Sequence, residues 1–278
     1  MNDIKIGVIG LGYVGKACLT FFQKSNVCFS FDINKKGTER NLHSLIKKIN
    51  IAFICVPTPM KKSGKCDISV VEKVLNEINS FEKRITCVIK STIPPGTTKS
   101  FQEKYPSLKI IFNPEFLTEA NFINDFENQD RIIIGDNNEN GIVNELYEKT
   151  FPKAQIINCL SQEAEMVKYF TNTFLATKVS FANEIFDLCS SLDINYNEIV
   201  EIATLDKRLG NSHFKVPGPD GLRGFGGSCF PKDLNSILYL LQKNELKSYI
   251  LQAAWDRNIN KDRKNQDWKE LKGRAVSE

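Results

Sequence analysis

The stretch "IKIGVIGLGYVG" (residues 4–15) decides the fold of the first half of this chain. It joins an apolar run to three glycines, Gly10, Gly12 and Gly15, and helical spacing follows over 13–25. A strand, a glycine turn and a helix in this order predict a dinucleotide site, because the turn presents the N–H groups of a helix N-terminus to a pyrophosphate. Glycines that serve only a tight strand-to-helix turn are the simpler alternative.

An acidic residue at the end of the next apolar run favours NAD as the dinucleotide. Asp32 lies 17 residues beyond Gly15. A carboxylate there accepts hydrogen bonds from the ribose hydroxyls and repels the 2′-phosphate of NADP. We therefore expect NAD as the cofactor, with Tyr13 and Val14 beside the glycines.

The first half of the chain alternates strand-like and helical segments. Nearly continuous apolar runs predict strands that are covered on both faces, and the segments between them show helical spacing. The predicted strands cover 4–10, 27–33, 51–57, 85–91, 109–113 and 131–135, and the predicted helices cover 13–25, 68–80 and 139–149. The fold class is therefore α/β, with a doubly wound parallel sheet of the Rossmann type.

Polar residues follow the third and fourth predicted strands. In an open parallel sheet the ligand crevice lies at the carboxyl ends of the strands. We expect cofactor contacts from the residues found there, which are Val56, Pro57, Thr58, Ser91 and Thr92. For the hydroxyl side chains, a local turn-capping role is the alternative.

The second half of the chain is mainly helical. The segment 161–192 contains no glycine or proline and predicts one helix of roughly 45 Å. Shorter helices are predicted over 196–204, 233–243 and 246–259, and a long loop rich in glycine and proline covers 206–231. We expect an NAD-binding domain over 1–158, a helical central and dimerisation domain over 159–260, and a charged C-terminal tail over 261–278. The tail is interpreted as a solvated end, with an ordered arm over a neighbouring subunit, anchored by Trp268 and Val276, as the alternative.

The bulk composition excludes several classes of protein. The chain has 278 residues, 41% of them hydrophobic and 25% charged, with a net charge of +4. This balance is ordinary for a globular protein and gives no argument for nucleic acid. Eight scattered cysteines and two histidines predict reduced thiols in a cytoplasm and no metal site. No apolar run is long enough for a membrane span, so we expect no membrane partner.

The stretch "GFGGSCFPKD" (224–233) places a cysteine, Cys229, between glycines and a predicted helix start. A thiol near a helix N-terminus, with Lys168 or Lys232 nearby, has a lowered pKa and acts as a nucleophile. Lys168 and Asn172 are four residues apart on the long helix and share one face. A face that is simply wet is the alternative for this pair.

Carboxylates accompany the cysteine. "FNPEFLTEA" (112–120) follows a predicted strand and carries Glu115 and Glu119, either of which is a candidate base or ribose ligand. Asp233 lies one helical turn from Cys229.

Seven motifs occur in the order found in one enzyme family, and over roughly residues 4–260 the chain resembles the UDP-glucose 6-dehydrogenase/GDP-mannose dehydrogenase family. The motifs are GLGYVG, VPTP, STIPPGT, NPEFLTEA, AEMVKYFTNTFLA, DKRLGNSHFKVPGPDG and GFGGSCFPKD. The resemblance implies the four-electron oxidation of a primary alcohol to a carboxylate with two NAD, and UDP-glucose giving UDP-glucuronate is the first expectation.

The resemblance also implies a role for each candidate residue. Cys229 would capture the aldehyde as a thiohemiacetal that becomes a thioester, and Lys168 and Asn172 would stabilise the oxyanion. The implied roles of the others are water positioning and proton relay for Asp233, Glu115 and Thr92, a nicotinamide border for Glu119, and sugar-nucleotide contacts for Phe116, Leu117, Thr118, Phe225 and Gly226. Arg208 would reach the substrate of the neighbouring subunit, which implies a homodimer joined through the long helix.

The sequence departs from the family pattern after the last motif. Family members usually continue with a second Rossmann-like domain that grips the uridine or guanosine diphosphate, so the expectation is a short form that lacks the C-terminal UDP-binding domain. A short enzyme whose site is weaker or completed by a neighbour, a separate chain that supplies the other half, and an idle NAD-binding or assembly subunit all stay open. Among substrates, GDP-mannose and UDP-N-acetylhexosamines are the alternatives.

Overall fold

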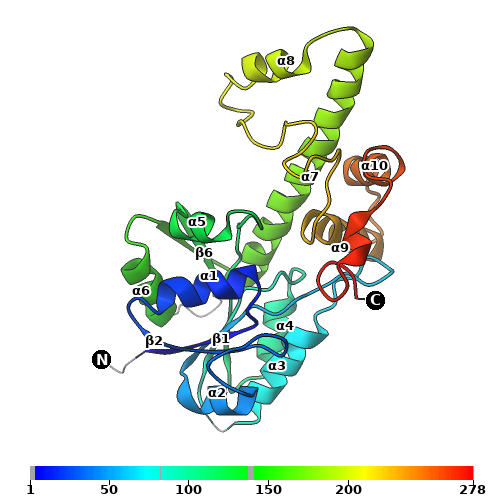
Figure 1. Cartoon of the computed structure of the whole chain (residues 1–278). Helices are drawn as coiled ribbons and strands as arrows, with labels where there is room; N and C mark the ends of the chain where they lie inside the picture. Colours follow the sequence, from blue (N-terminus) through cyan, green and yellow to red (C-terminus); the bar gives the residue numbers. More distant parts are fainter. Residues whose placement is uncertain (1–3, 82, 137–140, 278) are drawn as a thin grey trace. The chain divides into compact units, whose positions relative to one another are not determined.

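The computed structural model describes residues 4–81, 83–136 and 141–277. Its contacts divide the chain into two compact units (Figure 1). Unit 1 comprises Met1–Thr58 and Ile68–Lys168, and unit 2 comprises Pro59–Asp67 and Tyr169–Glu278. Within the described residues, no helix is both long and apolar enough to cross a membrane.

Unit 1 is built on a sheet with the order β2-β1-β3-β4-β5-β6-β7 in the described part of the chain. Its strands are parallel except where β6 runs antiparallel to β5. The strand bounds are β1 Lys5–Ile9, β2 Val27–Phe31, β3 Ile51–Ile54, β4 Thr86–Ile89, β5 Lys109–Phe112, β6 Arg131–Gly135 and β7 Gln155–Cys159. β2 lies on one side of β1 and β3 lies on the other, so the strand order reverses at β1. Open α/β sheets bind ligands at such a switch point.

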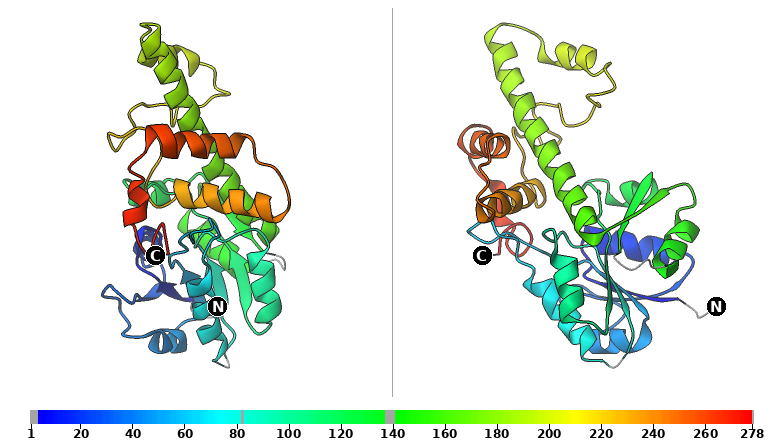
Figure 2. Two further views of the ribbon diagram at one scale, coloured as in Figure 1. Left: turned by 90° about the vertical axis from the view of Figure 1, so that its right-hand side faces the viewer. Right: turned by 180° about the vertical axis from the view of Figure 1, so that it is seen from behind.

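Helices cover both faces of this sheet, as Figures 1 and 2 show. Side chains of α2 (Leu42–Lys48), α3 (Ser69–Asn79) and α4 (Thr97–Lys104) form the core on one face. Side chains of α1 (Tyr13–Phe22), α5 (Phe122–Glu127) and α6 (Gly141–Thr150) form it on the other. The inner strands β1, β3, β4 and β5 therefore bury both of their faces, as their nearly continuous apolar runs predicted.

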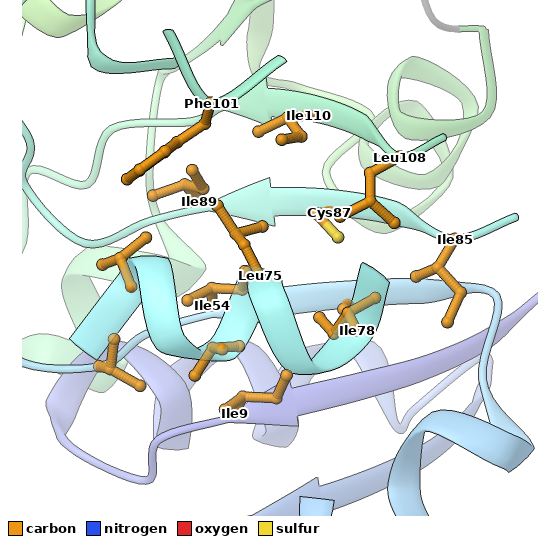
Figure 3. Packing of buried hydrophobic residues seen from close by; sticks show 14 of the residues in the cluster. Ile9, Ile54, Leu75, Ile78, Ile85, Cys87, Ile89, Phe101, Leu108 and Ile110 are labelled. Atoms are coloured by element: carbon orange, nitrogen blue, oxygen red, sulfur yellow. The ribbon is translucent and has the colours of Figure 1, made fainter. Parts of the chain in front are cut away.

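The spacing of apolar residues explains the packing of α3. Val71, Val74, Leu75 and Ile78 follow the i, i+3, i+4, i+7 pattern of one helical face, and all four are buried. Figure 3 shows Leu75 and Ile78 packed against Ile54, Ile85 and Ile89. Ile54 lies in β3 and Ile89 in β4, and Ile85 immediately precedes β4.

The α/β class and the doubly wound sheet are confirmed, with differences in detail. The sequence did not predict β7, α2, α4 or α5, and it predicted a wholly parallel sheet. β7 is mostly exposed or half-buried, so it lacks the apolar run that marks the inner strands. The helices α2, α4 and α5 have only 7, 8 and 6 residues, too few to establish a period. Positions 139 and 140 of the predicted helix 139–149 lie outside the described residues.

Unit 2 is helical, as predicted. It holds most of α7 (Ser161–Ser191), with α8 (Tyr196–Ala203), α9 (Phe230–Lys243) and α10 (Ile250–Arg257), and α9 lies beside α10 (Figure 2). α9 begins earlier than the predicted 233 because Pro231 fits the first turn of a helix, where its missing N–H is not needed.

Buried side chains within residues 261–277 contradict the prediction of a solvated tail. A π-helical turn, η1 (Asn258–Asp262), and a 3-10 turn, η2 (Asp267–Glu270), lead into a segment that packs within unit 2. Trp268 is fully buried and its ring lies 5.5 Å from that of Trp255. Met60 donates its N–H to Ala275, at 2.8 Å, and so ties Pro59–Asp67 to this segment. The many charged residues of this segment favoured a solvated tail in the sequence analysis, although Trp268 and Ala275 are buried.

The unit boundary falls inside α7, whereas the sequence placed a domain boundary at residue 158. The first turns of α7 pack against the sheet of unit 1: Ala164 belongs to its core, and Glu165 binds the first residues of α4. Local composition changes where β7 ends, but contacts assign the helix start to unit 1.

Candidate active site

The glycine turn of unit 1 has the geometry of a phosphate-binding loop. Gly10 has a φ of +90°, and its N–H donates to the Phe31 carbonyl at 2.9 Å. A Cβ on Gly15 would lie 1.8 Å from the Gly10 carbonyl oxygen, so only glycine allows α1 to approach β1 this closely. A Cβ on Gly12 would meet nothing within 4 Å, which leaves open space at the first residues of α1. Open space at a helix N-terminus suits a pyrophosphate.

Asp32 is fixed beside this turn. Its carboxylate accepts the N–H of Leu11 at 2.6 Å and those of Asn34 and Lys35 at 2.8 and 3.0 Å. A carboxylate at the end of β2 and next to the glycines fits the ribose of NAD. Tyr13, at the start of α1, packs against Phe122 with the two rings tilted and their centroids 5.2 Å apart.

The residues after β3 and β4 link the ends of these strands. Thr58 donates its hydroxyl to the Thr92 carbonyl at 2.7 Å, and Ser91 donates to the Val56 carbonyl at 2.6 Å. All four are buried, whereas Pro57 is exposed. The hydroxyl bonds of Thr58 and Ser91 therefore join the segments after β3 and β4 to each other rather than capping a local turn, and they hold both strand ends at the carboxyl edge of the sheet. Val14 lies in α1 and packs on the core.

Beyond β5, a buried ion pair joins Glu115 to α7. Lys168 donates to the Glu115 carbonyl oxygen at 2.6 Å and lies 3.1 Å from the carboxylate Oε1. Leu117 donates its N–H to the same carboxylate at 2.8 Å. Burial opposes the charge on Glu115, but Lys168, Leu117 and the nearby Lys90 together hold the pKa of that carboxyl below its ordinary value. Glu115 therefore stays ionised at neutral pH.

The other residues of this loop differ in exposure. The ring of Phe116 lies 5.4 Å from the Lys168 ammonium. Thr118 and Glu119 are exposed, and Thr118 donates its hydroxyl to Asp125 at 2.5 Å. Leu117 is half-buried.

Unit 2 places the cysteine at the start of a helix. Cys229 immediately precedes α9, and its carbonyl accepts the N–H of Asp233 at 3.0 Å. The Lys232 ammonium lies 2.5 Å from the Asp233 carboxylate. Burial opposes the charge on Lys232, but the charges of Asp233, Cys229 and Cys66 raise its pKa above the ordinary value. A permanent cation and a helix N-terminus both favour a thiolate at Cys229.

Asn172 completes this group from α7. Its side-chain amide donates to Asp233 Oδ2 at 2.5 Å, and the two side chains belong to residues that are 6% and 1% exposed. Asp233 therefore accepts from Lys232 on one oxygen and from Asn172 on the other. Lys168 lies one turn before Asn172 on α7, as predicted, and it binds the carbonyl and the carboxylate of Glu115 within unit 1.

Three more predicted residues of unit 2 have distinct surroundings. Arg208 is exposed over 89% of its side chain and pairs with Asp206. Phe225 is buried, and Gly226 lies against the guanidinium of Arg263.

Arg263 and Asn258, which bind the loop around Phe225, were missed by the sequence analysis because they lie in the segment interpreted as a helix end and tail. Glu165 was missed because a single acid in a helical pattern carries no signal of burial.

Comparison with known proteins identifies the family of this chain. Residues 34–151 match the NAD binding domain of the UDP-glucose/GDP-mannose dehydrogenase family, and residues 162–261 match its central domain. A UDP-glucose 6-dehydrogenase of Campylobacter jejuni is 32% identical over 92% of this chain and 76% of its own length. The chain belongs to the UDP-glucose/GDP-mannose dehydrogenase family. Unit 1 accordingly contains the NAD binding domain of that family.

Other relatives agree in sequence and in fold. A UDP-glucose 6-dehydrogenase of Rickettsia bellii is 38% identical over 75% of this chain and 49% of its own length. The chain spans about half the length of several such relatives. A solved UDP-glucose dehydrogenase of Pyrobaculum islandicum superposes with a TM-score of 0.83 at 27% identity, over 93% of this chain and 68% of that one.

Proposed function

We propose that this chain carries out the NAD-dependent oxidation of UDP-glucose to UDP-glucuronate, a four-electron conversion of a primary alcohol to a carboxylate. The observation that carries the proposal is the Cys229 group, in which a cysteine at a helix start adjoins a half-buried lysine, a buried carboxylate and a buried amide. Structural cysteines need no such neighbours, whereas a nucleophilic thiol does. The names of the relatives in the family supply the substrate.

The proposed chemistry needs two oxidations and one hydrolysis. The glycine turn and Asp32 would hold NAD, which would supply the hydride acceptor for each oxidation. After the first, the Cys229 sulfur adds to the aldehyde carbon, the C–S bond forms, and the carbonyl oxygen takes a proton to give a thiohemiacetal. The second oxidation removes the carbon-bound hydrogen as hydride and the hydroxyl proton, which leaves a thioester on Cys229.

Hydrolysis of the thioester completes the proposed reaction. Water adds to the carbonyl carbon, the C–S bond breaks, and the products are the carboxylate, the free thiol and a proton. Asn172 and Lys168 are proposed to donate hydrogen bonds to the oxygen that carries negative charge in these steps. Asp233, Glu115 and Thr92 are proposed to position the water and pass on its proton.

The stoichiometry of NADH tests this proposal directly. Limiting UDP-glucose with excess NAD should give two NADH per sugar, and UDP-glucuronate should be the product. Cys229→Ser should abolish turnover, while Cys159→Ser, which changes a half-buried cysteine of β7, should retain it. One NADH per sugar, or an active Cys229→Ser variant, would contradict the thioester route. NADH formed from GDP-mannose or a UDP-N-acetylhexosamine instead would identify a different substrate, and NAD binding without NADH from any of them would identify an idle subunit.

We also propose a homodimer joined through α7 and a location in the cytoplasm. Large apolar side chains are exposed along α7, at Phe170, Phe174, Phe181 and Leu188, which suits a helix that packs against a second copy. Arg208, with an exposed guanidinium, is proposed to reach the partner's substrate. A reaction that needs a reduced Cys229 suits a compartment that keeps thiols reduced.

A further inference from the structure

The loop that leads to Cys229 is held on several sides by the segment that follows α10. We define the cysteine loop as residues 223–229 and the clamp segment as residues 258–267. Both lie in unit 2. Every backbone contact described below joins these two stretches, which are about 35 residues apart in sequence.

Asn258 holds the middle of the cysteine loop. Its side-chain oxygen accepts the N–H of Phe225 at 2.8 Å, and its side-chain nitrogen donates to the Phe225 carbonyl at 2.9 Å. One fully buried amide thus satisfies both backbone polar groups of a residue that itself lies in the core. Such a pairing fixes the backbone of Phe225 as a strand partner would.

Arg263 holds the two sides of Phe225. Its guanidinium donates to the Arg223 carbonyl at 3.3 Å. A Cβ on Gly226 would lie 2.4 Å from Arg263 Nη2 and 2.7 Å from Cζ, so the Gly226 backbone rests directly on the guanidinium. The residue is only 3% exposed, which is unusual for a charged side chain without a structural task.

Two carboxylates keep this guanidinium in place. Asp267 accepts from Nε at 2.7 Å and from Nη2 at 3.0 Å, and Asp220 accepts from Nη2 at 2.6 Å. The paired contacts to Asp267 fix the plane of the guanidinium as well as its charge. Hydrogen bonding by Arg263, aided by the N–H of Gly227, holds the pKa of the Asp267 carboxyl below its ordinary value. Asp267 therefore binds the cysteine loop two residues before Cys229.

From these contacts we infer that Arg263 and Asp267 are positioning residues, which set the conformation of the cysteine loop and so the placement of Phe225, Gly226 and Cys229 for the sugar nucleotide. Neither is proposed to touch the reacting atoms. Lysine in place of Arg263 offers no planar fork, and so it cannot present a flat face to Gly226 and a paired contact to Asp267 together.

Amide hydrogen exchange on the whole chain, without substrate, tests the inference apart from turnover. In Arg263→Gln we expect the amides of 223–229 to exchange about tenfold faster or more, because their bonds open locally, while those of β4 keep their rate. Lys264→Gln removes the same charge from the adjacent, exposed residue and should leave both rates unchanged. Unchanged exchange of 223–229 in a folded Arg263→Gln variant, or equally faster exchange in β4, would overturn the inference.

Kinetics give the second measurement, and this part rests on the proposed function. In Arg263→Gln we expect KM for UDP-glucose to rise about tenfold or more while KM for NAD stays within about twofold, because the loop is proposed to bind the sugar. A merely destabilised protein would lose active enzyme and lower the apparent kcat with both KM values unchanged, which would count against positioning.

A milder variant guards against loss of folding. Asp267→Asn keeps the shape of the side chain and one acceptor oxygen, and it should accelerate exchange of 223–229 in the same direction by a smaller factor. If the variants show the expected exchange pattern but the wild-type protein does not oxidise UDP-glucose, the proposed function is refuted and the positioning role stays supported.

Discussion

Lys168 keeps its ammonium 2.6 Å from the backbone oxygen of Glu115 and 3.1 Å from the Glu115 carboxylate, and the residue is 3% exposed. Two acceptors fix a buried cation in this way and leave it few rotamers. A donor that is already oriented costs little reorganisation when charge develops on a substrate oxygen. The geometry therefore suits transition-state stabilisation better than loose substrate binding.

The Lys168→Ala variant should lower kcat by about two to three orders of magnitude, on the scale of one lost oxyanion donor. Steady-state kinetics with UDP-glucose and NAD would measure it, and Lys99→Ala, which removes an exposed lysine of α4, should behave as wild type. An effect confined to KM would show that Lys168 binds ground state and transition state equally, contrary to the proposed role.

At the residue scale, the sequence predicted the spacing of the candidate residues better than the contacts between them. Cys229 and Asp233 were predicted one helical turn apart, and α9 places them so. The contact between Asn172 and Asp233 was beyond prediction, because it joins residues 61 positions apart and depends on how α9 lies against α7. Lys232 was one of two lysines considered for the thiol, and spacing alone could not choose between them.

At the scale of elements, Glu165 ties α7 to α4. Its carboxylate is fully buried and accepts the N–H of Gly96 at 2.5 Å, the N–H of Thr98 at 2.8 Å and the Thr98 hydroxyl at 2.6 Å. Burial raises the pKa of Glu165 to about 7, although the Thr98 and Gly96 donors oppose the rise. One side chain thus caps α4 and anchors the first turns of α7.

This raised pKa predicts how stability depends on pH. The folded state binds the Glu165 proton more tightly than the unfolded chain does. Protonation of Glu165 therefore stabilises the folded state fully below about pH 4.3, and this stabilisation is lost as the pH rises through about 7. This stabilisation by the bound proton amounts to about 3.5 kcal/mol. Glu165→Gln cannot ionise, so its unfolding free energy should fall less steeply than that of wild type between pH 5 and about 8. Denaturant titrations across this range would measure the slopes, and parallel slopes would contradict the assignment.

The exposed stripe of α7 gives a prediction about assembly. Phe174 is 59% exposed and its ring is stacked near that of Phe170, with centroids 6.5 Å apart. If this face joins two copies, Phe174→Glu buries a charge without a partner, at a cost of about 3 kcal/mol or about 100-fold in Kd. Sedimentation should then find monomer at concentrations where wild type is a dimer.

Ser190→Glu is the matched control for assembly. It adds the same charge to an exposed position on another face of α7 and should leave the dimer intact. A wild-type monomer, or a Phe174→Glu dimer of unchanged affinity, would contradict an interface at this stripe.

Periodicity determined which elements were predictable. α7 was predicted over 161–192 and is observed over Ser161–Ser191, since 31 residues of unbroken helical spacing leave little ambiguity. The half-exposed edge strand β7 and the short helices α2, α4 and α5 present no long pattern. Their boundaries are set by packing against the sheet, which a single sequence does not reveal.

At the scale of the whole molecule, the two units draw on different parts of the chain than the sequence indicated. Pro59–Asp67 leaves unit 1 between β3 and α3 and joins unit 2, where Met60 binds Ala275 and Ser277. These pairings join residues more than 200 positions apart. Nothing in the local composition marks them, so the segment 258–277 was taken for a helix end and a solvated tail.

The stability of unit 2 can be measured separately from that of unit 1. Both tryptophans of the chain, Trp255 and Trp268, lie in unit 2, so tryptophan fluorescence reports on that unit alone. Trp268→Ala removes a fully buried ring and should lower the unfolding free energy of unit 2 by about 3–5 kcal/mol, with Trp255 as the remaining reporter. Lys269→Ala, at the adjacent exposed position, should cause no such loss.

NAD binding measured by calorimetry on the Trp268→Ala variant tests whether the cofactor site of unit 1 depends on the stability of unit 2. The glycine turn, Asp32 and both sheet cores belong to unit 1, so Trp268→Ala should bind NAD within about twofold of wild type despite its weakened unit 2. Turnover should fall, because Cys229 and the loop that carries it depend on the segment around Trp268. An unchanged denaturation midpoint would show that the buried ring contributes little to stability. Loss of NAD affinity in step with loss of stability would show that the cofactor site depends on unit 2.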